Sequence, residues 1–505
     1  MLLQNNTCFA MQKCSNIFFH IIIFLFFTSC SLTRTAHYQF NQKYAAQKLI
    51  EDVVLLKKIL EANHPSLYWY TTKDSFDARF NTVINSITDS LTEVEFRNKV
   101  AYAVSGIHCG HTSVRFSKQY NKQAHKHIYP AFPLSIKIWQ DSMVVLGNLL
   151  KHNKQLKPGT IITSINGKTI ETITASMFPY IGTDGYAANY KYQVISGNFG
   201  GWYKNIFGLE KKYTVDYIDS LGNKQQTILS NFTLKKDTVT KKDSIISLNP
   251  SIEKRIKISA LQQKRMLSID TSFSTAYMRL TTFGRAKLKK FFRQSFRTIH
   301  KNNLKNLIID LRENGGGNVD NFVKLTQYLK DSSFNIGDTI EAVTRKLAYK
   351  KYIHPGIIQW LNLNFLTTKK ADGNYHQQRS EEHYFRLKTK HHFNGHVYIV
   401  TGGYTYSAAS MFAGIMKGQH NVTLVGEETG GGYYGNTAMQ IPDIVLPTSH
   451  LRVRLPLFKV VLNANRAKNG RGVLPDVYVP PSSIAIKKNI DIKLDAIKNL
   501  IRTNP

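Results

Sequence analysis

Cysteine is scarce in this sequence of 505 residues and lies mostly at one end of it. Cys8, Cys14 and Cys30 fall in or beside an N-terminal hydrophobic segment, which leaves Cys109 alone in the rest of the chain. A chain that begins at Cys30 would therefore retain one other thiol. No framework of intramolecular disulfides can form from that number, so the class of disulfide-stapled domains is excluded.

Acidic residues are also few, because 33 Asp and Glu stand against 67 Lys and Arg, for a formal net charge of +34. Such an excess raises the question of an anionic partner. The basic residues are spread along the whole sequence, however, and it contains no zinc-finger, RNP-type or basic-arm pattern. They gather only in short clusters at Lys287–Lys290, Lys346–Lys351 and Lys487–Lys488. We expect no nucleic-acid partner, and an acidic membrane surface or another anionic polymer is the alternative interpretation.

The one long, almost wholly apolar run, Ile17–Phe27, is short for a transmembrane helix. Lys13 precedes it and Thr28-Ser29 leads into Cys30, an arrangement that resembles a bacterial lipoprotein signal over residues 1–30. Cys30 is then the predicted lipidation site, and an uncleaved anchor is the alternative. The lipidated Cys30 and the uncleaved anchor both predict a protein held to a membrane of the bacterial cell envelope, on the periplasmic or outer-membrane side.

The remaining chain is too long for one hydrophobic core and should divide into several domains. Apolar residues at helical spacing predict helices near its start, and β/α alternation predicts an α/β core nearer its end. A Lys-, Ser- and Asp-rich stretch without periodicity predicts a linker between them. The expected parts are a helical segment (31–120), a β-rich domain (125–235), a linker (236–270), an α/β core (271–485) and a C-terminal helix (486–505).

Within the β-rich domain, Leu156–Ile170 reads as a Pro-Gly turn, a strand and an Asn166-Gly167 turn. Asn-Gly favours a tight hairpin. The run resembles part of a PDZ-like domain, a module that binds extended peptides by strand addition. An unrelated hairpin is the alternative interpretation.

Two apolar strands of the α/β core end in unusual turns. Leu307–Leu311 leads towards three consecutive glycines, Gly315–Gly317, and Val397–Val400 leads through Gly402-Gly403 to Ser407. Glycines allow backbone amides to approach a ligand closely, and a small-residue turn before a helix presents one hydroxyl at the helix N-terminus. Together the two turns suggest an oxyanion hole that faces a serine nucleophile. The alternative is that Ser407 only caps its helix.

A third segment places a histidine near the start of the chain. A predicted helix breaks at Gly106 and delivers His111 into the next strand, which makes His111 a candidate base. His108, Cys109 and His111 also suggest zinc, but their spacing is too tight for one tetrahedral ion. Cys109 as a nucleophile lacks a glycine-rich partner nearby. We expect no metal and no cofactor.

Four stretches now occur in one order: Asp310–Gly317, Tyr406–Ser410, Gly426–Gly431 and Gly472–Asp476. This combination resembles the family of C-terminal processing peptidases and the tricorn core protease. The resemblance implies a ClpP/crotonase-like α/β protease core, with an N-terminal helical segment and an inserted PDZ-like domain. It also implies a serine endopeptidase that forms an acyl-enzyme and cleaves exported polypeptides bound as extended strands. A catalytically inactive relative that binds peptides or an apolar ligand is the alternative.

The resemblance also assigns roles to single residues. Ser407 is the expected nucleophile, and the amides of Gly316 and Ala408 are the expected oxyanion hole. The lysine base of the processing branch is missing, because Gly430–Tyr433 stands in its place, so the tricorn-like branch points to His111. The residue that orients His111 stays open between three candidates: Asn469, Glu427 and Glu428.

Overall fold

The structure is a computed structural model that describes residues 38–124, 130–150, 152–233 and 260–503. The expected signal segment, its lipidation site Cys30 and most of the expected linker lie outside the described residues. No helix within the described residues has the length and the apolar character that crossing a membrane requires.

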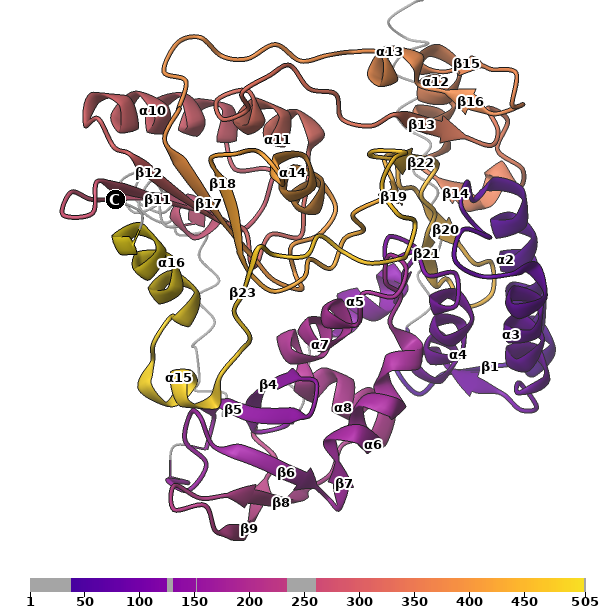
Figure 1. Ribbon diagram of the computed structural model, residues 1–505. Helices are drawn as coiled ribbons and strands as arrows, with labels where there is room; N and C mark the ends of the chain where they lie inside the picture. The colour runs from indigo at the N-terminus through magenta and orange to yellow at the C-terminus, as the bar shows by residue number, and fades with distance from the viewer. Residues whose placement is uncertain (1–37, 125–129, 151, 234–259, 504–505) are drawn as a thin grey trace, which may run out of the picture. The chain divides into compact units, whose positions relative to one another are not determined.

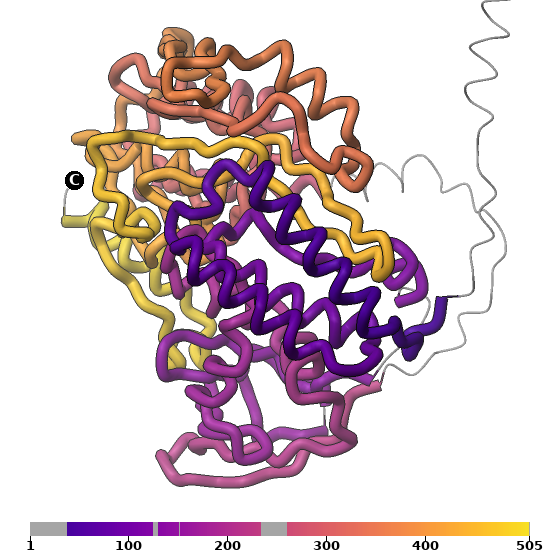
Figure 2. The backbone as a smooth tube through the Cα atoms, turned by 90° about the vertical axis from the view of Figure 1, so that its right-hand side faces the viewer, coloured from indigo at the N-terminus to yellow at the C-terminus, as the bar shows by residue number. Residues whose placement is uncertain are grey.

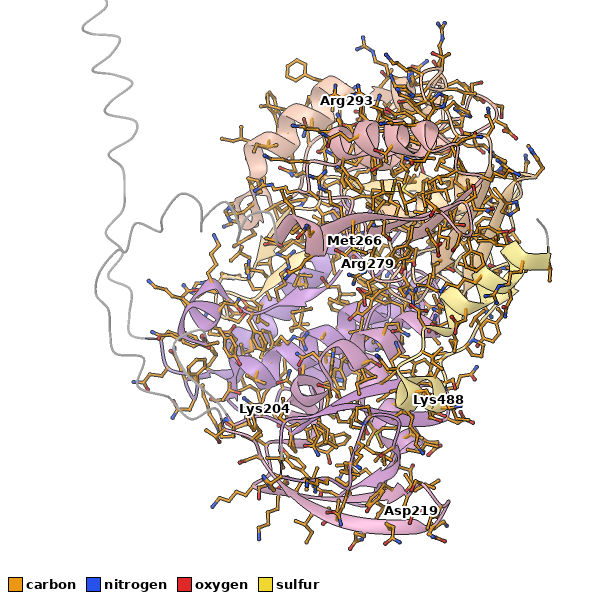
Figure 3. The ribbon with its side chains drawn as sticks, turned by 90° about the vertical axis from the view of Figure 1, so that its left-hand side faces the viewer. Lys204, Asp219, Met266, Arg279, Arg293 and Lys488 are labelled. Carbon is orange, nitrogen blue, oxygen red and sulfur yellow. The ribbon has the colours of Figure 1, made fainter. Side chains whose placement is uncertain are left out.

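A six-stranded sheet forms the centre of the α/β core, in the order β10-β11-β12-β17-β18-β23 (Figure 1). The strands from β11 to β23 run parallel, and β10 is an antiparallel edge strand. Met266 of β10 and Arg279 of β11 are paired residues of this edge (Figure 3). The bounds are β10 Arg265–Asp270, β11 Thr275–Leu280, β12 Asn306–Asp310, β17 His396–Thr401, β18 Val422–Gly426 and β23 Val477–Tyr478.

Helices cover both faces of this sheet (Figure 1). Leu307 and Ile309 of β12 belong to the large core with α10 (Leu288–Lys301), α11 (Val319–Thr326) and α14 (Ala408–Met416). Ile308, between them, points to the opposite face and packs with α16 (Ile492–Thr503). A parallel strand buried on both faces requires an unbroken apolar run, which is why β12 and β17 could be recognised in the sequence.

The N-terminal helices share this large core instead of forming one of their own. They are α2 (Ala46–Asn63), α3 (Lys73–Asn85) and α4 (Glu93–Ser105), drawn in indigo in Figure 2. Thr92 and Glu95 form a capping box at the start of α4, where reciprocal hydrogen bonds satisfy otherwise free helix amides. The chain then enters β3 (Val114–Arg115), which pairs with β21 (Arg452–Arg454) of the C-terminal part. This pairing joins the segment after α4 to the C-terminal part of the described chain.

Residues from Phe132 to Leu229 enclose a separate hydrophobic cluster. Their sheet has the order β4-β5-β6-β8-β9, and β7 pairs with β6 across the expected Asn166-Gly167 turn. Asn166 and Gly167 both have positive φ, 49° and 71°, as a tight hairpin of this type requires. The relation of this region to PDZ domains stays a prediction. Its elements are β4 Leu134–Trp139, β5 Ser142–Asn148, β6 Ile161–Ile165, β7 Lys168–Thr169, α6 Ile170–Met177, η1 Phe178–Tyr180, α7 Ala188–Gly197, α8 Phe199–Phe207, β8 Lys212–Ile218 and β9 Lys224–Ser230.

Three smaller antiparallel sheets complete the described chain, in the orders β15-β16-β13-β22-β19, β14-β20-β21-β3 and β1-β2. Their strands are β1 Lys43–Tyr44, β2 Leu91–Thr92, β13 Thr339–Ala342, β14 Ile353–His354, β15 Thr368–Lys369, β16 Tyr375–His376, β19 Gly435–Ala438, β20 Asp443–Val445 and β22 Phe458–Val461. The other elements are α5 Lys118–Ala124, η2 Lys350–Tyr352, α12 Gly356–Leu366, α13 Gln378–Glu381 and α15 Ser483–Lys488.

One expectation needs correction at the start of the α/β core. The linker was expected to extend to residue 270, but residues 265–270 form β10. None of the six residues of β10 is buried: two are partly buried and four are exposed. An edge strand has a neighbouring strand on one side only, so it need not be an apolar run that a sequence search would find.

Candidate active site

The two glycine-containing turns meet where β12 and β17 end. These strands are parallel neighbours, with Asp310 paired to Val400, so their carboxyl ends lie at the same edge of the sheet. The hydroxyl of Thr405 donates a hydrogen bond to the carbonyl of Leu311 at 2.8 Å. The amide of Tyr406 donates to the carbonyl of Asn314 at 3.0 Å. These two bonds fix the loop before Ser407 against the glycine loop.

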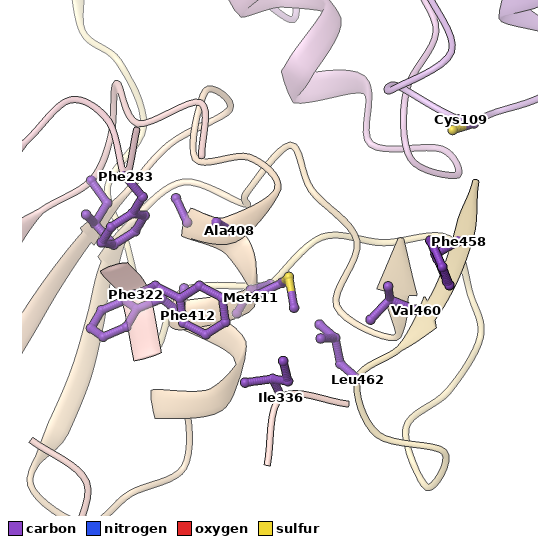
Figure 4. Close-up of a cluster of buried hydrophobic side chains, with 14 of the residues drawn as sticks. Cys109, Phe283, Phe322, Ile336, Ala408, Met411, Phe412, Phe458, Val460 and Leu462 are labelled. Carbon is purple, nitrogen blue, oxygen red and sulfur yellow. The ribbon is translucent and has the colours of Figure 1, made fainter. Parts of the chain in front are cut away.

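Ser407 adopts a backbone conformation that is rare outside glycine, with φ 55° and ψ −125°. Backbone strain at a strand-to-helix turn is the geometry that lifts a nucleophilic serine out of its surroundings. Its side chain makes no capping hydrogen bond to α14, so helix capping does not explain its presence. Phe412 of the same helix packs against Phe283, which fixes the helix that begins at Ser407 (Figure 4).

His111 lies beside this serine. Its Nε2 atom is 3.0 Å from Oγ of Ser407, which is hydrogen-bond distance. His111 stands in the loop between α4 and β3, and the pairing of Val114 with Val453 brings that loop to the C-terminal part of the chain. The imidazole is buried, whereas Ser407 is partly exposed. Sequence reasoning paired these two residues, and the structure brings them together.

The other ring nitrogen of His111 meets a pair of residues that the sequence did not suggest. The hydroxyl of Tyr406 lies 3.2 Å from Nδ1 of His111 and donates to Oδ1 of Asp184 at 2.7 Å. Since that hydroxyl proton goes to Asp184, its oxygen is free to accept the Nδ1 proton of His111. This assignment leaves Nε2 unprotonated and able to accept from Ser407. The four side chains thus form one hydrogen-bonded chain.

Asp184 is anchored from a second direction as well. Its Oδ1 atom also accepts the amide of Gly110 at 3.0 Å, so it holds the backbone next to His111. A Cβ on Gly110 would stand 2.3 Å from the Tyr406 hydroxyl, so a larger residue cannot occupy this position without displacing Tyr406. Asp184 lies in a Gly- and Tyr-rich stretch of no regular period. The one local feature of the sequence is that Tyr406 directly precedes Ser407. This feature does not reveal that Tyr406 contacts Asp184.

Burial governs the electrostatics of this chain. Desolvation lowers the pKa of His111 to about 3, and the nearby charge of Arg454 acts in the same direction. Desolvation raises the pKa of Asp184 to about 6, although hydrogen bonds from Tyr406 and two backbone amides oppose the rise. At neutral pH the imidazole is therefore neutral and the carboxyl group is mostly ionised.

The glycine loop packs directly against Ser407. A Cβ on Gly316 would come within 2.7 Å of the Ser407 Cβ and 2.9 Å of the Ala408 amide nitrogen. The φ of Gly316, 93°, also disfavours other residues. Its amide donates to the side chain of Asn314 at 2.9 Å, while the other end of Asn314 donates to Leu280. For the amide of Ala408, the first of its helix, the described residues offer no hydrogen-bond partner.

The three residues considered as orienting groups for His111 have other partners. Glu427 is buried and paired with Lys493 at 2.7 Å. Glu428 accepts two hydrogen bonds from Arg471, and the side chain of Asn469 accepts the Arg471 amide. The described contacts of His111 thus run to Tyr406 and Ser407 and to none of these three.

Cys109, His111 and Asp184 lie close enough together to share a metal ion, and all three are buried. Burial raises the pKa of the Cys109 thiol to about 12, whereas a metal ligand must be the thiolate. Both nitrogens of His111 are already hydrogen-bonded. The donor set therefore fits a hydrogen-bonded chain better than a metal centre.

Comparisons with known proteins concern the family and the fold of the chain. The sequence model of peptidase family S41 matches residues 274–479. The fold is similar to that of mature CPAF, with a TM-score of 0.63 and 12% identity over 90% of this chain and 97% of that chain. Mature CPAF complexed with lactacystin gives 0.62, with 12% identity over 91% and 99%. A photosystem II D1 C-terminal processing protease gives 0.38, with 12% identity over 86% and 93%.

No curated protein matches the sequence. At such low identities the two CPAF structures support the fold alone, and the matched segment supports the family. That segment includes the glycine loop, Ser407 and the strands that position them, and through it the chain matches the sequence model of peptidase family S41.

Proposed function

We propose that this peptidase is a serine endopeptidase in which Ser407 is the nucleophile and His111 the general base. The observation that carries the proposal is the 3.0 Å contact between His111 Nε2 and Ser407 Oγ. A nucleophile and base within hydrogen-bond reach, with the base oriented by a third group, is the arrangement that acyl transfer requires. Such a contact also speaks against the alternative of an inactive, peptide-binding relative.

In the first step, the Ser407 proton moves to Nε2 of His111 as Oγ bonds to the carbonyl carbon of the scissile peptide. The carbonyl oxygen becomes an oxyanion, and the amide of Ala408, which has no partner among the described residues, is a suitable donor to it. The amide of Gly316 is the second proposed donor. It is held by Asn314 in this structure and must leave that acceptor to bond the oxyanion.

Collapse of this intermediate breaks the C–N bond, and the departing amine takes the proton from His111. An acyl-Ser407 ester remains. A water molecule then gives a proton to Nε2 and attacks the ester, and the returning proton restores the Ser407 hydroxyl as the acid is released. Atoms and charges balance without a metal ion or cofactor in any step.

Tyr406 and Asp184 are positioning residues in this proposal. They hold the imidazole in the tautomer that leaves Nε2 free. The positive charge that His111 acquires in the transition state faces the Asp184 carboxylate, 3.9 Å from Nδ1. Opposite charges at this distance in a buried site attract strongly.

The substrates proposed are exported polypeptides bound as extended strands. Support comes from the lipoprotein-like sequence of residues 1–30 and from the hairpins of the 132–229 region, whose edge strands suit peptide addition. On this proposal Cys30 carries a lipid, and the enzyme works at the cell envelope. C-terminal processing and tricorn-like cleavage are the two finer activities that the sequence resemblance suggests.

The test combines covalent labelling with turnover. The full chain is treated with a fluorophosphonate probe and, separately, assayed on casein and on a fluorogenic peptide. We expect labelling and turnover in the natural chain, and loss of both in Ser407→Ala. Ser410→Ala is the matched control for labelling, because Ser410 is one helical turn away and its hydroxyl bonds the Ser407 carbonyl. Labelling that persists in Ser407→Ala rules out this nucleophile, and peptide binding without turnover favours the inactive relative.

A further inference from the structure

Helix α12 (Gly356–Leu366) exposes apolar side chains to an unusual degree. It lies at the upper right of Figure 1, near α13 and β15. The exposed fractions are Ile357 77%, Phe365 76%, Ile358 55%, Leu366 55%, Trp360 50% and Leu361 41%. Single exposed apolar residues are ordinary on protein surfaces, but six on one short helix form a contiguous patch that marks an interaction site.

Most of the apolar side chains of this helix face outward. Its inward side carries Gln359 and Leu363, which are 7% and 0% exposed. Ile357, Leu361 and Phe365, spaced four apart, form a continuous row on the outward side. A water-soluble surface helix normally places its polar side chains outward. The outer face of α12 is therefore built to contact something apolar.

The helix is held firmly in this orientation. Arg345 donates from Nε to the Thr367 hydroxyl at 3.0 Å and from its other end to the Thr367 carbonyl. The Thr367 hydroxyl donates in turn to the carbonyl of Leu363, inside the helix. A guanidinium at a helix C-terminus also satisfies its dipole. These bonds keep Leu363 inward and the apolar row outward.

The patch is flanked by positive charge at both ends. Residues 343–371 contain no Asp or Glu, and their cations are Arg345, Lys346, Lys350, Lys351, Lys369 and Lys370. Lys346, Lys350, Lys351 and Lys369 are exposed, and in the described part of the chain they form no ion pair. An apolar face with a tryptophan, bordered by lysines, matches the depth profile of a bilayer surface rich in anionic lipid.

We propose that α12 is an in-plane membrane-binding helix. Its apolar row enters the boundary between headgroups and acyl chains of an anionic phospholipid bilayer, and the flanking lysines bind lipid phosphates. The helix has 11 residues, roughly 16 Å at the usual rise, so it lies in the surface and does not span it. This role is independent of the peptidase chemistry.

A second copy of this chain is a less suitable occupant. A symmetric dimer through α12 sets the same patch against itself, so the cationic borders of the two copies meet. The 343–371 segment offers no carboxylate to neutralise them. A bilayer of anionic lipid supplies both the apolar layer and the opposite charge.

Bromolipid quenching of tryptophan fluorescence tests the proposal on the full chain. The chain has four tryptophans, and none of them falls in residues 1–37, so an N-terminal anchor carries no signal of its own. Vesicles of phosphatidylcholine and phosphatidylglycerol with brominated acyl chains are added, and Trp360→Phe isolates the contribution of Trp360. We expect quenching in the natural chain and its loss in Trp360→Phe.

Three double variants decide the cause of that quenching. Ile357→Ser with Phe365→Ser should weaken it at least tenfold in lipid titration. Tyr478→Ser with Ile484→Ser is the matched control, because these side chains are also 62% and 63% exposed but lie far along the sequence. The control should bind like the natural chain, and Lys350→Glu with Lys351→Glu should abolish the preference for phosphatidylglycerol.

Quenching that is the same in Trp360→Phe, or that survives Ile357→Ser with Phe365→Ser, overturns the proposal. Sedimentation in the absence of vesicles measures the oligomeric state and so tests the alternative, a second copy of the chain bound to the patch. A dimer that dissociates in Ile357→Ser with Phe365→Ser, together with no quenching, assigns the patch to a second copy of the chain.

Discussion

His111 and Ser407 are 296 positions apart in the sequence, yet Nε2 of one lies 3.0 Å from Oγ of the other. Neither local segment produces this contact alone. The loop of His111 reaches Ser407 because β3 pairs with β21, and Ser407 is raised by a turn that the glycine loop supports. The candidate site is thus a property of the assembled chain.

We expect Ser407 and His111 to act as one unit. Each single change to alanine should lower kcat/KM by roughly 10³-fold or more, because the nucleophile cannot act without the base. The double variant should be no slower than the slower single variant. His108→Ala is the control, since His108 bonds the Gly185 carbonyl instead of Ser407. Effects that multiply in the double variant would show that the two residues act independently.

Tyr406→Phe tests the positioning role of the Tyr406 hydroxyl. The ring is kept, with its contact to His111 at a centroid distance of 4.8 Å, while both hydrogen bonds are lost. We expect kcat to fall roughly 10- to 100-fold with KM unchanged, a part of the 10²–10⁴ that a positioned base supplies. Steady-state kinetics on a fluorogenic peptide measure the split. A change confined to KM would assign Tyr406 to substrate binding.

The pH dependence of kcat/KM should show an acid limb near pH 6. The pKa of Asp184 is raised to about 6, so below that pH its carboxyl group gains a proton and no longer accepts from Tyr406 in the same way. Activity is therefore present above this pKa and lost as the pH falls through it. The pKa of His111, about 3, is too low to cause this limb.

Asp184→Asn provides the discriminating variant. We expect it to be slower at every pH above 7 and to lose the limb near pH 6, since its side chain does not titrate. A limb that stays near pH 6 in Asp184→Asn would mean that His111 titrates there. Circular dichroism over the same pH range separates loss of activity from unfolding.

Gly316→Ala should remove activity while the rest of the fold persists. The added Cβ would stand 2.7 Å from the Cβ of Ser407, and the φ of 93° is strained for alanine. Strain of this kind costs roughly 1–3 kcal/mol, which a domain of this size tolerates. Gly373→Ala is the matched control, because its φ of 84° is also positive and its Cβ meets nothing within 4 Å. Equal activity in the two variants would separate Gly316 from the site.

Strands β12 and β17 were predictable because each is buried on two faces and so reads as an apolar run. The start of α4 was predictable from its capping residues, and the Asn166-Gly167 turn from its dipeptide. The pairing of Ser407 with His111 required the family resemblance, since nothing in the local sequence of His111 points to residue 407.

The positioning pair could not be found in this way. Asp184 follows no periodicity, and its role depends on the Tyr406 hydroxyl and the Gly110 amide, which converge on it from distant segments. Glu427 and Glu428 are nearer to a predicted motif but are engaged by Lys493 and Arg471. Only the packed structure decides which acidic group meets the imidazole. The exposed apolar face of α12 could not be predicted for the same reason. Periodicity shows that a helix has distinct faces but not which face is buried.

The pairing of β3 with β21 also determines when, during synthesis of the chain, the candidate site can form. His111 is synthesised early, Ser407 much later, and the strand that joins their segments is complete only at Arg454. A nascent chain that ends before this point has no partner strand for β3. The candidate site can thus assemble only after the segment up to Arg454 has been made, and translation products that end before it lack the site.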